Sequence, residues 1–472
     1  MWLALAVAGV AACGAADAPA DAAEVATTAA AGRSGDGDGA SLRWIPNGSG
    51  VSLTLRADGG PLDDRANPFF LSLGTNGRAC SSCHVPEAGM TITPAVAQRA
   101  FARTGGRDPM FRTNDGAVSP LADVSTVRAR RKAYALLLDR AVIRVGIGVP
   151  AGAEFELLST ADPHAFASAA ELSLFRRPLP TANLRFLSTV MWDGRETFRD
   201  TSEPTGFATI PFDLAHQANG ATVGHAQAAA PLDDAQRSAI VAYESQLFTA
   251  QAWDADAGWL DARGARGGPR ALSGEPFHFG INDTLGNDPA GLPFDPVAMT
   301  LFDGWAGASG ARAAIARGQA LLNSRTFDIA GVGGLNDDLG IPTLRGTCTT
   351  CHNAPNAGDH TVPMPLRIGI DAPVPAGGAL DTRGLPRYVL RNLATGETIE
   401  TTDPGRALVT GRWKDVGRFK GPVLRGLASR PPYFHNGSAA TLEDAVRFYD
   451  ARFSIGLTDA EVADLVAFLA AL

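Results

Sequence analysis

Two copies of Cys-x-x-Cys-His stand in the 472-residue chain, at positions 80–84 and 348–352. In this pattern two thiols can form thioethers with the vinyl groups of a c-type haem, and the adjacent histidine can bind the iron. A redox dithiol or half of a zinc site would also use Cys-x-x-Cys. The repeated histidine favours haem, so the sequence predicts two covalently bound haem c groups. The predicted attachment residues, with the histidines as iron ligands, are Cys80, Cys83, His84, Cys348, Cys351 and His352.

The composition limits the class of protein. Hydrophobic residues make up 45% of the chain and charged residues 19%, which is ordinary for a folded globular protein. The formal net charge is -8 and no basic stripe stands out, so we expect no nucleic-acid partner.

Residues 1–13 have the features of an export signal. An uninterrupted apolar run from Trp2 to Ala12 is too short to span a bilayer, and Cys13 follows small residues, as in a bacterial lipoprotein signal. No Lys or Arg precedes the run, which leaves two readings open: an ordinary signal peptide, or a lipid anchor at an acylated Cys13. Both predict a protein of the periplasm or cell envelope, which suits the attachment of c-type haem outside the cytoplasm.

The two haem motifs are far enough apart to lie in separate domains. Residues 14–43 are rich in Ala, Gly, Asp and Thr, and are predicted to form a disordered tether. We expect an N-terminal c-haem domain over residues 44–255 and a C-terminal one over residues 256–472. The boundary is placed in the Gly/Asp/Ala-rich stretch 254–274.

Helical patterns dominate, so the predicted fold is mainly α, with two cytochrome c-like haem domains and a small extended or β insert in the second. Three segments with helical character are 127–138, 234–248 and 311–322. A last helix should follow the capping box at 458–461. Turn signals at 395–396 and 403–405 predict a hairpin or extended insert between residues 387 and 411.

Longer motifs accompany the two haem motifs. They are Met-Trp-Asp-Gly-Arg at 191–195 and the segments 419–426, 432–437 and 441–446. In order and spacing these motifs resemble those of the bacterial dihaem cytochrome c peroxidase and MauG family, over about residues 65 to 472. The resemblance implies an oxidoreductase that uses hydrogen peroxide at an open N-terminal haem and exchanges electrons with a second haem.

The resemblance assigns roles to single residues near the second haem. Trp192 matches the tryptophan that relays electrons or holes between the haems; a core tryptophan is the alternative. Tyr449 stands fourteen residues after His435, where peroxidases of the family have an axial methionine and MauG-type members a tyrosine. Tyr449 is therefore predicted to bind the second iron, although it could be a buried core residue, and Met364 and His360 are the competing ligands. A phenolate ligand would favour the ferric state.

Around the first haem the chain departs from the family. No histidine lies between His84 and His164, which predicts an iron with an open distal side. The family's catalytic glutamine has a counterpart in Gln217, but Gln227 stands where its glutamate would. His225 is the predicted substitute, because an imidazole can move a proton at near-neutral pH. The alternatives for His225 are iron ligation and a surface position.

Other family features are altered or structural. The asparagine of the family's interhaem calcium site aligns with Arg177, which cannot bind a cation. Calcium would then depend on backbone carbonyls near Arg430 and Pro432. His435 is expected to support structure near the second haem, and Arg195 to be structural or to contact a haem propionate.

Three functions are consistent with these residues. The first is a cytochrome c peroxidase that reduces hydrogen peroxide with electrons from a small donor protein, such as a cytochrome c or a cupredoxin. The second is a MauG-like oxidase or oxygenase that acts on a protein or organic substrate through high-valent haems. The third is a non-catalytic electron-transfer cytochrome.

Overall fold

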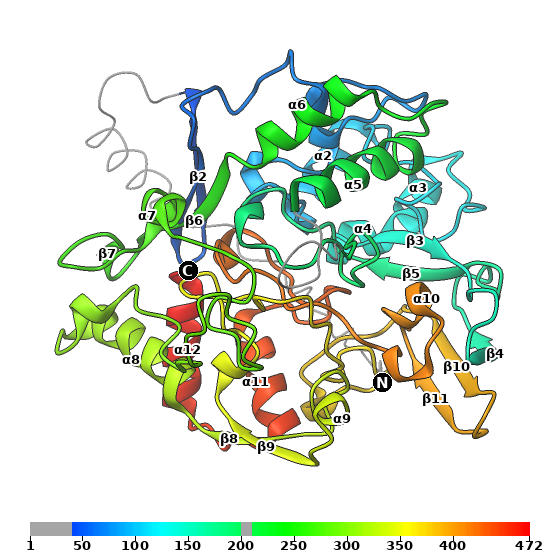
Figure 1. The fold of residues 1–472 in the computed structure, drawn as a ribbon. Helices are drawn as coiled ribbons and strands as arrows, with labels where there is room; N and C mark the ends of the chain where they lie inside the picture. Colours follow the sequence, from blue (N-terminus) through cyan, green and yellow to red (C-terminus); the bar gives the residue numbers. More distant parts are fainter. Residues whose placement is uncertain (1–39, 200–209) are drawn as a thin grey trace, which may run out of the picture.

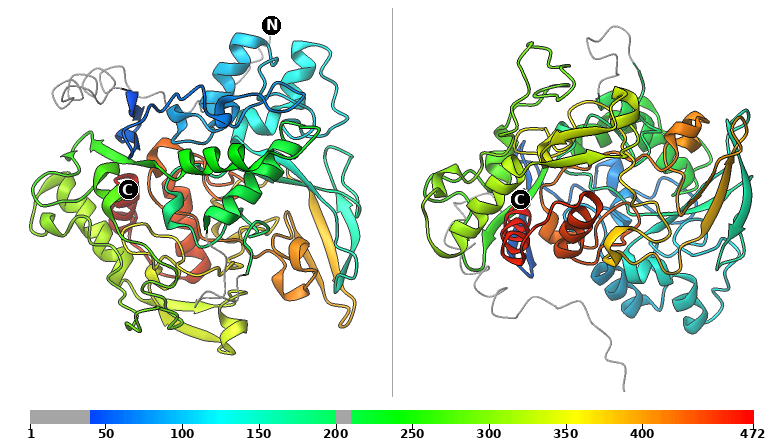
Figure 2. Two further views of the ribbon diagram at one scale, coloured as in Figure 1. Left: turned by 45° about the horizontal axis from the view of Figure 1, so that its top comes forward. Right: turned by 90° about the horizontal axis from the view of Figure 1, so that it is seen from below.

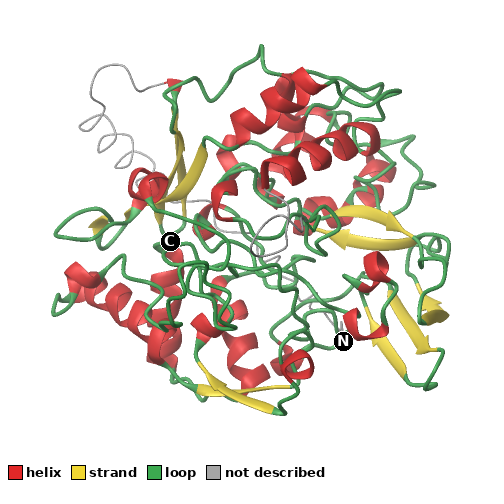
Figure 3. Cartoon of the chain, viewed as in Figure 1, coloured by secondary structure: helices red, strands yellow, loops and turns green. Residues whose placement is uncertain are grey.

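The computed structural model describes residues 40–199 and 210–472. The predicted signal 1–13 with Cys13, and all of the predicted tether 14–43 except its last residues, lie outside the described residues. The described part consists of short helices and small sheets joined by long loops (Figures 1 and 3). Within these residues no helix combines the length and the apolar character that a membrane span requires.

The helices flank the segments that carry the two Cys-x-x-Cys-His motifs. The helices before residue 250 are α2 (Pro94–Thr104), α3 (Val127–Ala133), α4 (Ala135–Arg140), α5 (Ile210–Gly224) and α6 (Asp234–Glu244). The later helices are α7 (Gly268–Gly274), α8 (Gly310–Ser324), α9 (Asn336–Leu339), α10 (Ala407–Thr410), α11 (Leu442–Phe453) and α12 (Asp459–Ala470). Each haem motif itself begins with a short 3-10 helix, at Cys80–Ser82 and at Cys348–Thr350.

The helix predictions hold in part. The helix predicted at 127–138 is two helices, because Tyr134 has a non-helical backbone between α3 and α4. The helix predicted at 234–248 ends at Glu244, and the chain enters a strand at Leu247. The helices α8 and α12 lie where they were predicted, and the Thr458 side chain caps α12 by accepting from the Glu461 amide.

The predicted fold, mainly α, is incomplete because the described residues also form several small sheets. One antiparallel sheet has the order β1 (Leu42–Asn47), β2 (Gly50–Arg56), β6 (Leu247–Asp254) and β7 (Gly258–Trp259). Two further antiparallel pairs are β3 (Ile143–Ile147) with β5 (Leu172–Arg176), and β8 (Phe327–Ala330) with β9 (Thr343–Gly346). Both β2 and β5 are buried almost throughout. The residues of β2 alternate between apolar and polar from Val51 to Arg56, so the sequence contained a strand signal there that the prediction missed. In β5 two apolar residues stand next to each other and break the alternation.

The predicted hairpin is present, but it is not confined to the second half of the chain. Its strands are β10 (Arg387–Asn392) and β11 (Thr398–Thr401). Strand β10 also pairs with β4 (Phe155–Ala161), which lies beside the hairpin in Figure 2. The buried Tyr388 hydroxyl donates to the carbonyl of Ser173 at 2.8 Å and accepts from its amide at 2.9 Å. The hairpin is thus joined to strands of the N-terminal half.

The two halves of the chain also share a hydrophobic core. One buried cluster combines Phe186, Val190 and Phe248 with Ala354 and Val423. The stretch proposed as the boundary contains β7 and α7, both packed beside β6. The division into residues 44–255 and 256–472 therefore stays a prediction, and the structure places the two parts in close contact.

Candidate functional site

The first haem motif lies in the wall of a large cavity. Cys80, Cys83 and His84 line a space of about 1680 Å³, part of which is open to solvent. The Nδ1 atom of His84 lies 3.1 Å from the carbonyl oxygen of Met90. Histidines that bind a metal usually donate the N–H of the second ring nitrogen to such a carbonyl. The Nε2 atom of His84 makes no hydrogen bond to residues 40–199 or 210–472 and is available to an iron.

The second motif repeats this arrangement. Cys348, Cys351 and His352 line another cavity, of about 1720 Å³ including solvent-open space. The Nδ1 atom of His352 lies 2.6 Å from the carbonyl oxygen of Gly358. Each histidine therefore has the orientation that an axial haem ligand requires.

The thiols in both motifs fit haem attachment better than dithiol chemistry. All four are free rather than paired in disulfides. Burial raises the pKa of Cys80 and Cys351 to about 12, and that of Cys83 and Cys348 to about 11. Redox-active cysteines have a lowered pKa instead. Among the described residues no group of three or more His, Cys, Asp or Glu side chains could hold a zinc ion. Both cavities thus fit a haem c.

The two cavities share a wall that contains Trp192. This side chain is 8% exposed, and its Nε1–H donates to the carbonyl of Arg177 at 2.8 Å. The residues that line both cavities are Arg177, Pro178, Leu179, Pro180, Trp192, Lys420, Pro422 and Arg430. The position of Trp192 is the one that an interhaem relay needs, and the relay itself stays a prediction.

A buried ion-pair network fixes the Trp-Asp-Gly-Arg element. Arg176, at the end of β5, donates through Nη1 to Asp193 at 2.5 Å and through Nε to Asp403 at 2.6 Å. Arg195 adds an ion pair to Asp193 at 3.1 Å. Burial raises the pKa of Asp193, but the charges of Arg176 and Arg195 outweigh it and bring the pKa to about 2. The network holds the backbone next to Trp192, and Arg195 also lines the first cavity.

His435 packs behind the shared wall. Its ring stacks on Phe419 with centroids 4.0 Å apart and meets the edge of Trp192 at 6.4 Å. Neither ring nitrogen has a hydrogen-bond partner in the described part of the chain. Burial lowers the pKa of His435 to about 4, so the ring is neutral and supports the position of Trp192 by packing.

Tyr449, on α11, faces His352 across the second cavity. The two ring centroids are 6.4 Å apart with an interplanar angle of 75°. The phenol hydroxyl makes no hydrogen bond to any described residue, although the side chain lines the cavity. Among the competing ligands, His360 lies 3.1 Å from the Cys351 carbonyl through Nδ1 and 3.4 Å from an Asp283 carboxylate oxygen through Nε2. The Nδ1 atom faces a carbonyl, but Nε2 is buried without a hydrogen-bond partner and His360 lines the same cavity, so His360 and Met364 both stay alternatives to Tyr449.

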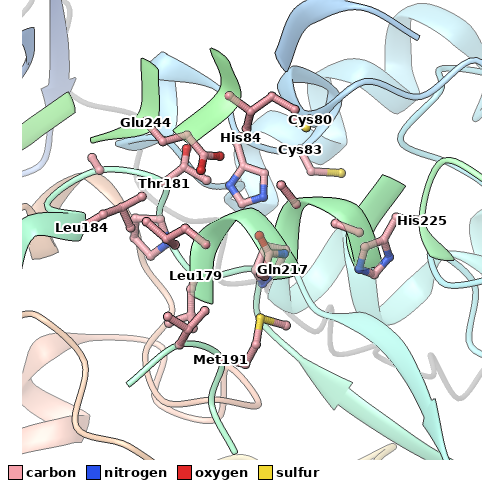
Figure 4. A pocket seen from close by; sticks show the side chains of 18 of the residues that line it. Cys80, Cys83, His84, Leu179, Thr181, Leu184, Met191, Gln217, His225 and Glu244 are labelled. Carbon is pink, nitrogen blue, oxygen red and sulfur yellow. The ribbon is translucent and has the colours of Figure 1, made fainter. Parts of the chain in front are cut away.

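Gln217 and His225 both line the first cavity (Figure 4). Gln217 lies within α5 and His225 follows directly after its end. With Ala221 they form an i, i+4, i+8 row, which places them on one face of the helix. Gln227 does not line this cavity. Its Oε1 accepts a hydrogen bond from the side-chain amide Nδ2 of Asn76 at 3.2 Å. The structure thus joins Gln217 and His225 at one site and separates Gln227 from them.

The sequence did not reveal the residues that hold His225. The Nδ1 atom of His225 lies 2.5 Å from Asp115, and the other carboxylate oxygen of Asp115 accepts from buried Arg78. Burial raises the pKa of Asp115, but the hydrogen bond and charge of His225 and the charge of Arg78 bring it below its usual value. Asp115 therefore stays ionised and orients the imidazole with Nε2 free. No local pattern connects Asp115 with His225.

A second missed group is Glu244, at the end of α6. It is 4% exposed and lines the first cavity together with His84 (Figure 4). Burial raises its pKa to about 8, so the carboxyl is mainly protonated at neutral pH. A signal was present in the sequence, because Glu244 stands four residues after Ile240 on the apolar face of a predicted helix.

The residues present do not fit the expected calcium ion. The Arg430 carbonyl, one of the candidate ligands, accepts from Nη2 of Arg177 at 3.2 Å. The guanidinium of Arg177 is thus hydrogen-bonded to the carbonyl oxygen that a calcium ion would need as a ligand.

Comparisons with known proteins agree with the class that these cavities define, a protein with covalently bound haem c. No family model matches the chain. It is 34% identical over 139 residues to cytochrome-c peroxidase IdrP1 of Denitromonas iodatirespirans, a match that covers 26% of this chain and 36% of the relative. It is 32% identical over 136 residues to cytochrome c551 peroxidase of Nitrosomonas europaea, covering 28% and 33%. A crystal structure of a MauG-like protein associated with microbial copper homeostasis covers 86% of this chain and 87% of its own at 17% identity, with a TM-score of 0.34.

Over these segments the chain is similar to bacterial cytochrome c peroxidases, and the resemblance read from its motifs is confirmed at that level. The matches span about a third of the length of these curated relatives.

Proposed function

We propose that the protein is a dihaem c-type oxidoreductase that consumes hydrogen peroxide at the cavity of His84 and exchanges electrons with the cavity of His352 through Trp192. One observation carries this proposal: two cavities, each with a Cys-x-x-Cys-His motif, share a wall that contains Trp192. Their polar groups differ, since Gln217 and His225 line the first cavity and Tyr449 lines the second. The asymmetry supports different tasks for the two sites.

The chemistry at the first cavity divides between the cofactor and the chain. A bound haem supplies a redox-active iron to which peroxide can coordinate. With Asp115 holding its Nδ1–H, His225 presents a basic Nε2 that can accept a proton from one peroxide oxygen and return it to the other. The side-chain amide of Gln217 can donate a hydrogen bond to the substrate. Overall, hydrogen peroxide, two electrons and two protons give two water molecules.

The electrons come from outside the chain and cross the shared wall. The proposed donor is a small electron-transfer protein, a cytochrome c or a cupredoxin, or else an oxidisable substrate. The Trp192 N–H donates to a backbone carbonyl, which is too weak a base to take the proton. An electron can therefore pass through the indole without loss of its proton. The predicted export signal and the haem motifs support a location in the periplasm or cell envelope.

A second candidate function is favoured by Tyr449. A phenolate ligand stabilises ferric iron, whereas the thioether of a peroxidase-type site raises the potential and favours ferrous iron. A second haem with a tyrosine ligand would be poorly suited to receive electrons from a conventional donor. It would suit a MauG-like oxidase or oxygenase that removes electrons from a protein or organic substrate.

The test begins with the diferric holoprotein. We expect electron paramagnetic resonance to show one iron with an open position, and we expect added hydrogen peroxide to change the optical spectrum within the mixing time of a stopped-flow instrument. Turnover with a reduced cytochrome c or cupredoxin would identify the peroxidase. Reaction with peroxide without such turnover would favour the oxidase. Two six-coordinate low-spin irons that do not react with peroxide would exclude both enzyme functions. The electron-transfer cytochrome would then be the remaining function.

Replacing Trp192 by phenylalanine should slow electron transfer between the two sites by about tenfold or more, equivalent to about 1.4 kcal/mol in the barrier. The reaction of peroxide at the first site should keep its rate. Stopped-flow mixing of the half-reduced protein with peroxide resolves the two steps. The matched control is Trp305→Phe, because Trp305 is a buried core tryptophan that lines neither cavity. Equal transfer rates in the two variants would make Trp192 a core residue only.

A further inference from the structure

Arg177 is a buried cation that ties together separate segments of the chain in the wall between the cavities. Its side chain is 6% exposed. The Nη2 atom donates to the carbonyls of Ile92 at 3.0 Å and Arg430 at 3.2 Å, and Nη1 donates to the carbonyl of Arg140 at 3.4 Å. Its own backbone amide donates to the carbonyl of His435 at 2.6 Å. The guanidinium thus joins two segments of the N-terminal half to one of the C-terminal half.

These acceptors are the kind of ligand that calcium uses. Ca²⁺ is bound by backbone carbonyls, side-chain oxygens and water, in sets of six to eight oxygens. The carbonyl oxygens around Arg177 converge on one positive group and none of them belongs to an ionised side chain. In the described part of the chain, Arg177 forms no ion pair with a carboxylate. The guanidinium is therefore a monovalent cation surrounded by backbone carbonyl oxygens.

Charge also opposes a metal ion at this position. Burial and the charge of Arg430 lower the pKa of Arg177 to about 9, which leaves it positively charged at neutral pH. Arg430 is partly buried, and its Nη2 donates to the carbonyl of Val423 at 2.7 Å. Lys420 lines the same wall and donates to the carbonyl of Thr189 at 2.7 Å. A divalent cation would have to displace the hydrogen bonds of Arg177 and enter beside the positive charge of Arg430.

We propose that the guanidinium of Arg177 takes the place of a calcium ion between the two cavities, so that the contact between the two halves of the protein needs no metal. The role goes beyond the proposed function, because it concerns how the shared wall is held and does not depend on the reaction.

The test compares the holoprotein with an Arg177→Asn variant, in which a side-chain oxygen replaces the cation. Wild type is expected to contain less than stoichiometric calcium by elemental analysis and to melt at the same temperature with and without EDTA. Arg177→Asn should melt several degrees lower in EDTA and recover part of the loss on addition of CaCl₂. Arg177→Lys, which keeps a charge, should remain insensitive to calcium.

Arg425→Asn is the matched control. Arg425 is 1% exposed and also donates only to backbone carbonyls, those of Leu472 and Asn356 at 2.9 Å and of Gly268 at 3.5 Å. Its replacement should lower the melting temperature without recovery by calcium. Stoichiometric calcium in wild type, with a melting temperature that falls in EDTA, would overturn the proposal. So would an Arg177→Asn variant that neither loses stability nor binds calcium. If that variant does not fold, the calcium content of wild type and Arg177→Lys decides the question.

Discussion

Replacement of Tyr449 by methionine should raise the midpoint potential of the second haem by a few tenths of a volt, within the roughly 0.8 V over which axial ligands set haem potentials. The reason is the exchange of an anionic oxygen, which stabilises ferric iron, for a neutral thioether, which favours ferrous iron. Burial raises the pKa of the Tyr449 phenol, and a coordinated metal ion reverses that effect by stabilising the anion. The measurement is an optical redox titration of the holoprotein.

The competing ligand supplies the control for this experiment. Met364 lines the same cavity, so Met364→Leu removes one of the two competing ligand candidates. We expect Met364→Leu to leave the potential of the second haem almost unchanged. If Met364→Leu shifts the potential and Tyr449→Met does not, then methionine binds the iron. The peroxidase would then be favoured over the oxidase.

Replacement of His225 by glutamine should reduce the rate constant for the reaction with hydrogen peroxide by about 10²–10⁴-fold, the usual contribution of a general acid or base. Glutamine keeps a polar side chain of similar size but cannot carry the proton between the two oxygens. The rate is measured by stopped-flow absorbance over a series of peroxide concentrations. Asp115→Asn, which perturbs the orientation of the ring while leaving the imidazole in place, should give a smaller loss.

A histidine within α5 gives a matched control. His216 is about half exposed, lies 2.5 Å from Glu196 through Nδ1 and does not line the first cavity. His216→Gln should therefore react with peroxide at the wild-type rate. A His225→Gln variant with the wild-type rate would refute the acid–base role. If the same variant instead converts the ferric iron to another spin state, His225 is an iron ligand.

The sequence predicted the covalent part of the site because that chemistry is local. A Cys-x-x-Cys-His motif must keep its spacing in the chain, whereas the partners of His84 and His352 are backbone carbonyls with no side-chain signature. The predicted difference between the two haem sites came from two single positions, Tyr449 and His225. Both were located by the order of motifs that the chain shares with the family. In the structure His225 lines the first cavity and Tyr449 lines the second.

What the sequence did not predict depends on contacts between distant segments. Asp115 reaches His225 across 110 residues, and nothing near either residue indicates the pair. Glu244 could have been found, since an acidic residue on the apolar face of a helix is unusual. The alternation of β2 could also have been found, whereas β5 breaks the alternation with two adjacent apolar residues. The helix predicted to reach residue 248 ended early because Leu247 pairs with Arg56 in a sheet.

The pairing of β4 with β10 has a consequence for how the chain reaches its native state. Residues 155–161 are synthesised long before residues 387–392, so the edge of β4 stays unpaired until its partner strand has been made. Contacts between such distant segments slow folding, and an unpaired strand edge invites association with other chains. The first Cys-x-x-Cys-His motif is therefore synthesised while that edge is still unpaired. Pairing of β4 with β10 needs both halves of the chain, so the N-terminal half has an exposed strand edge until the C-terminal half is made.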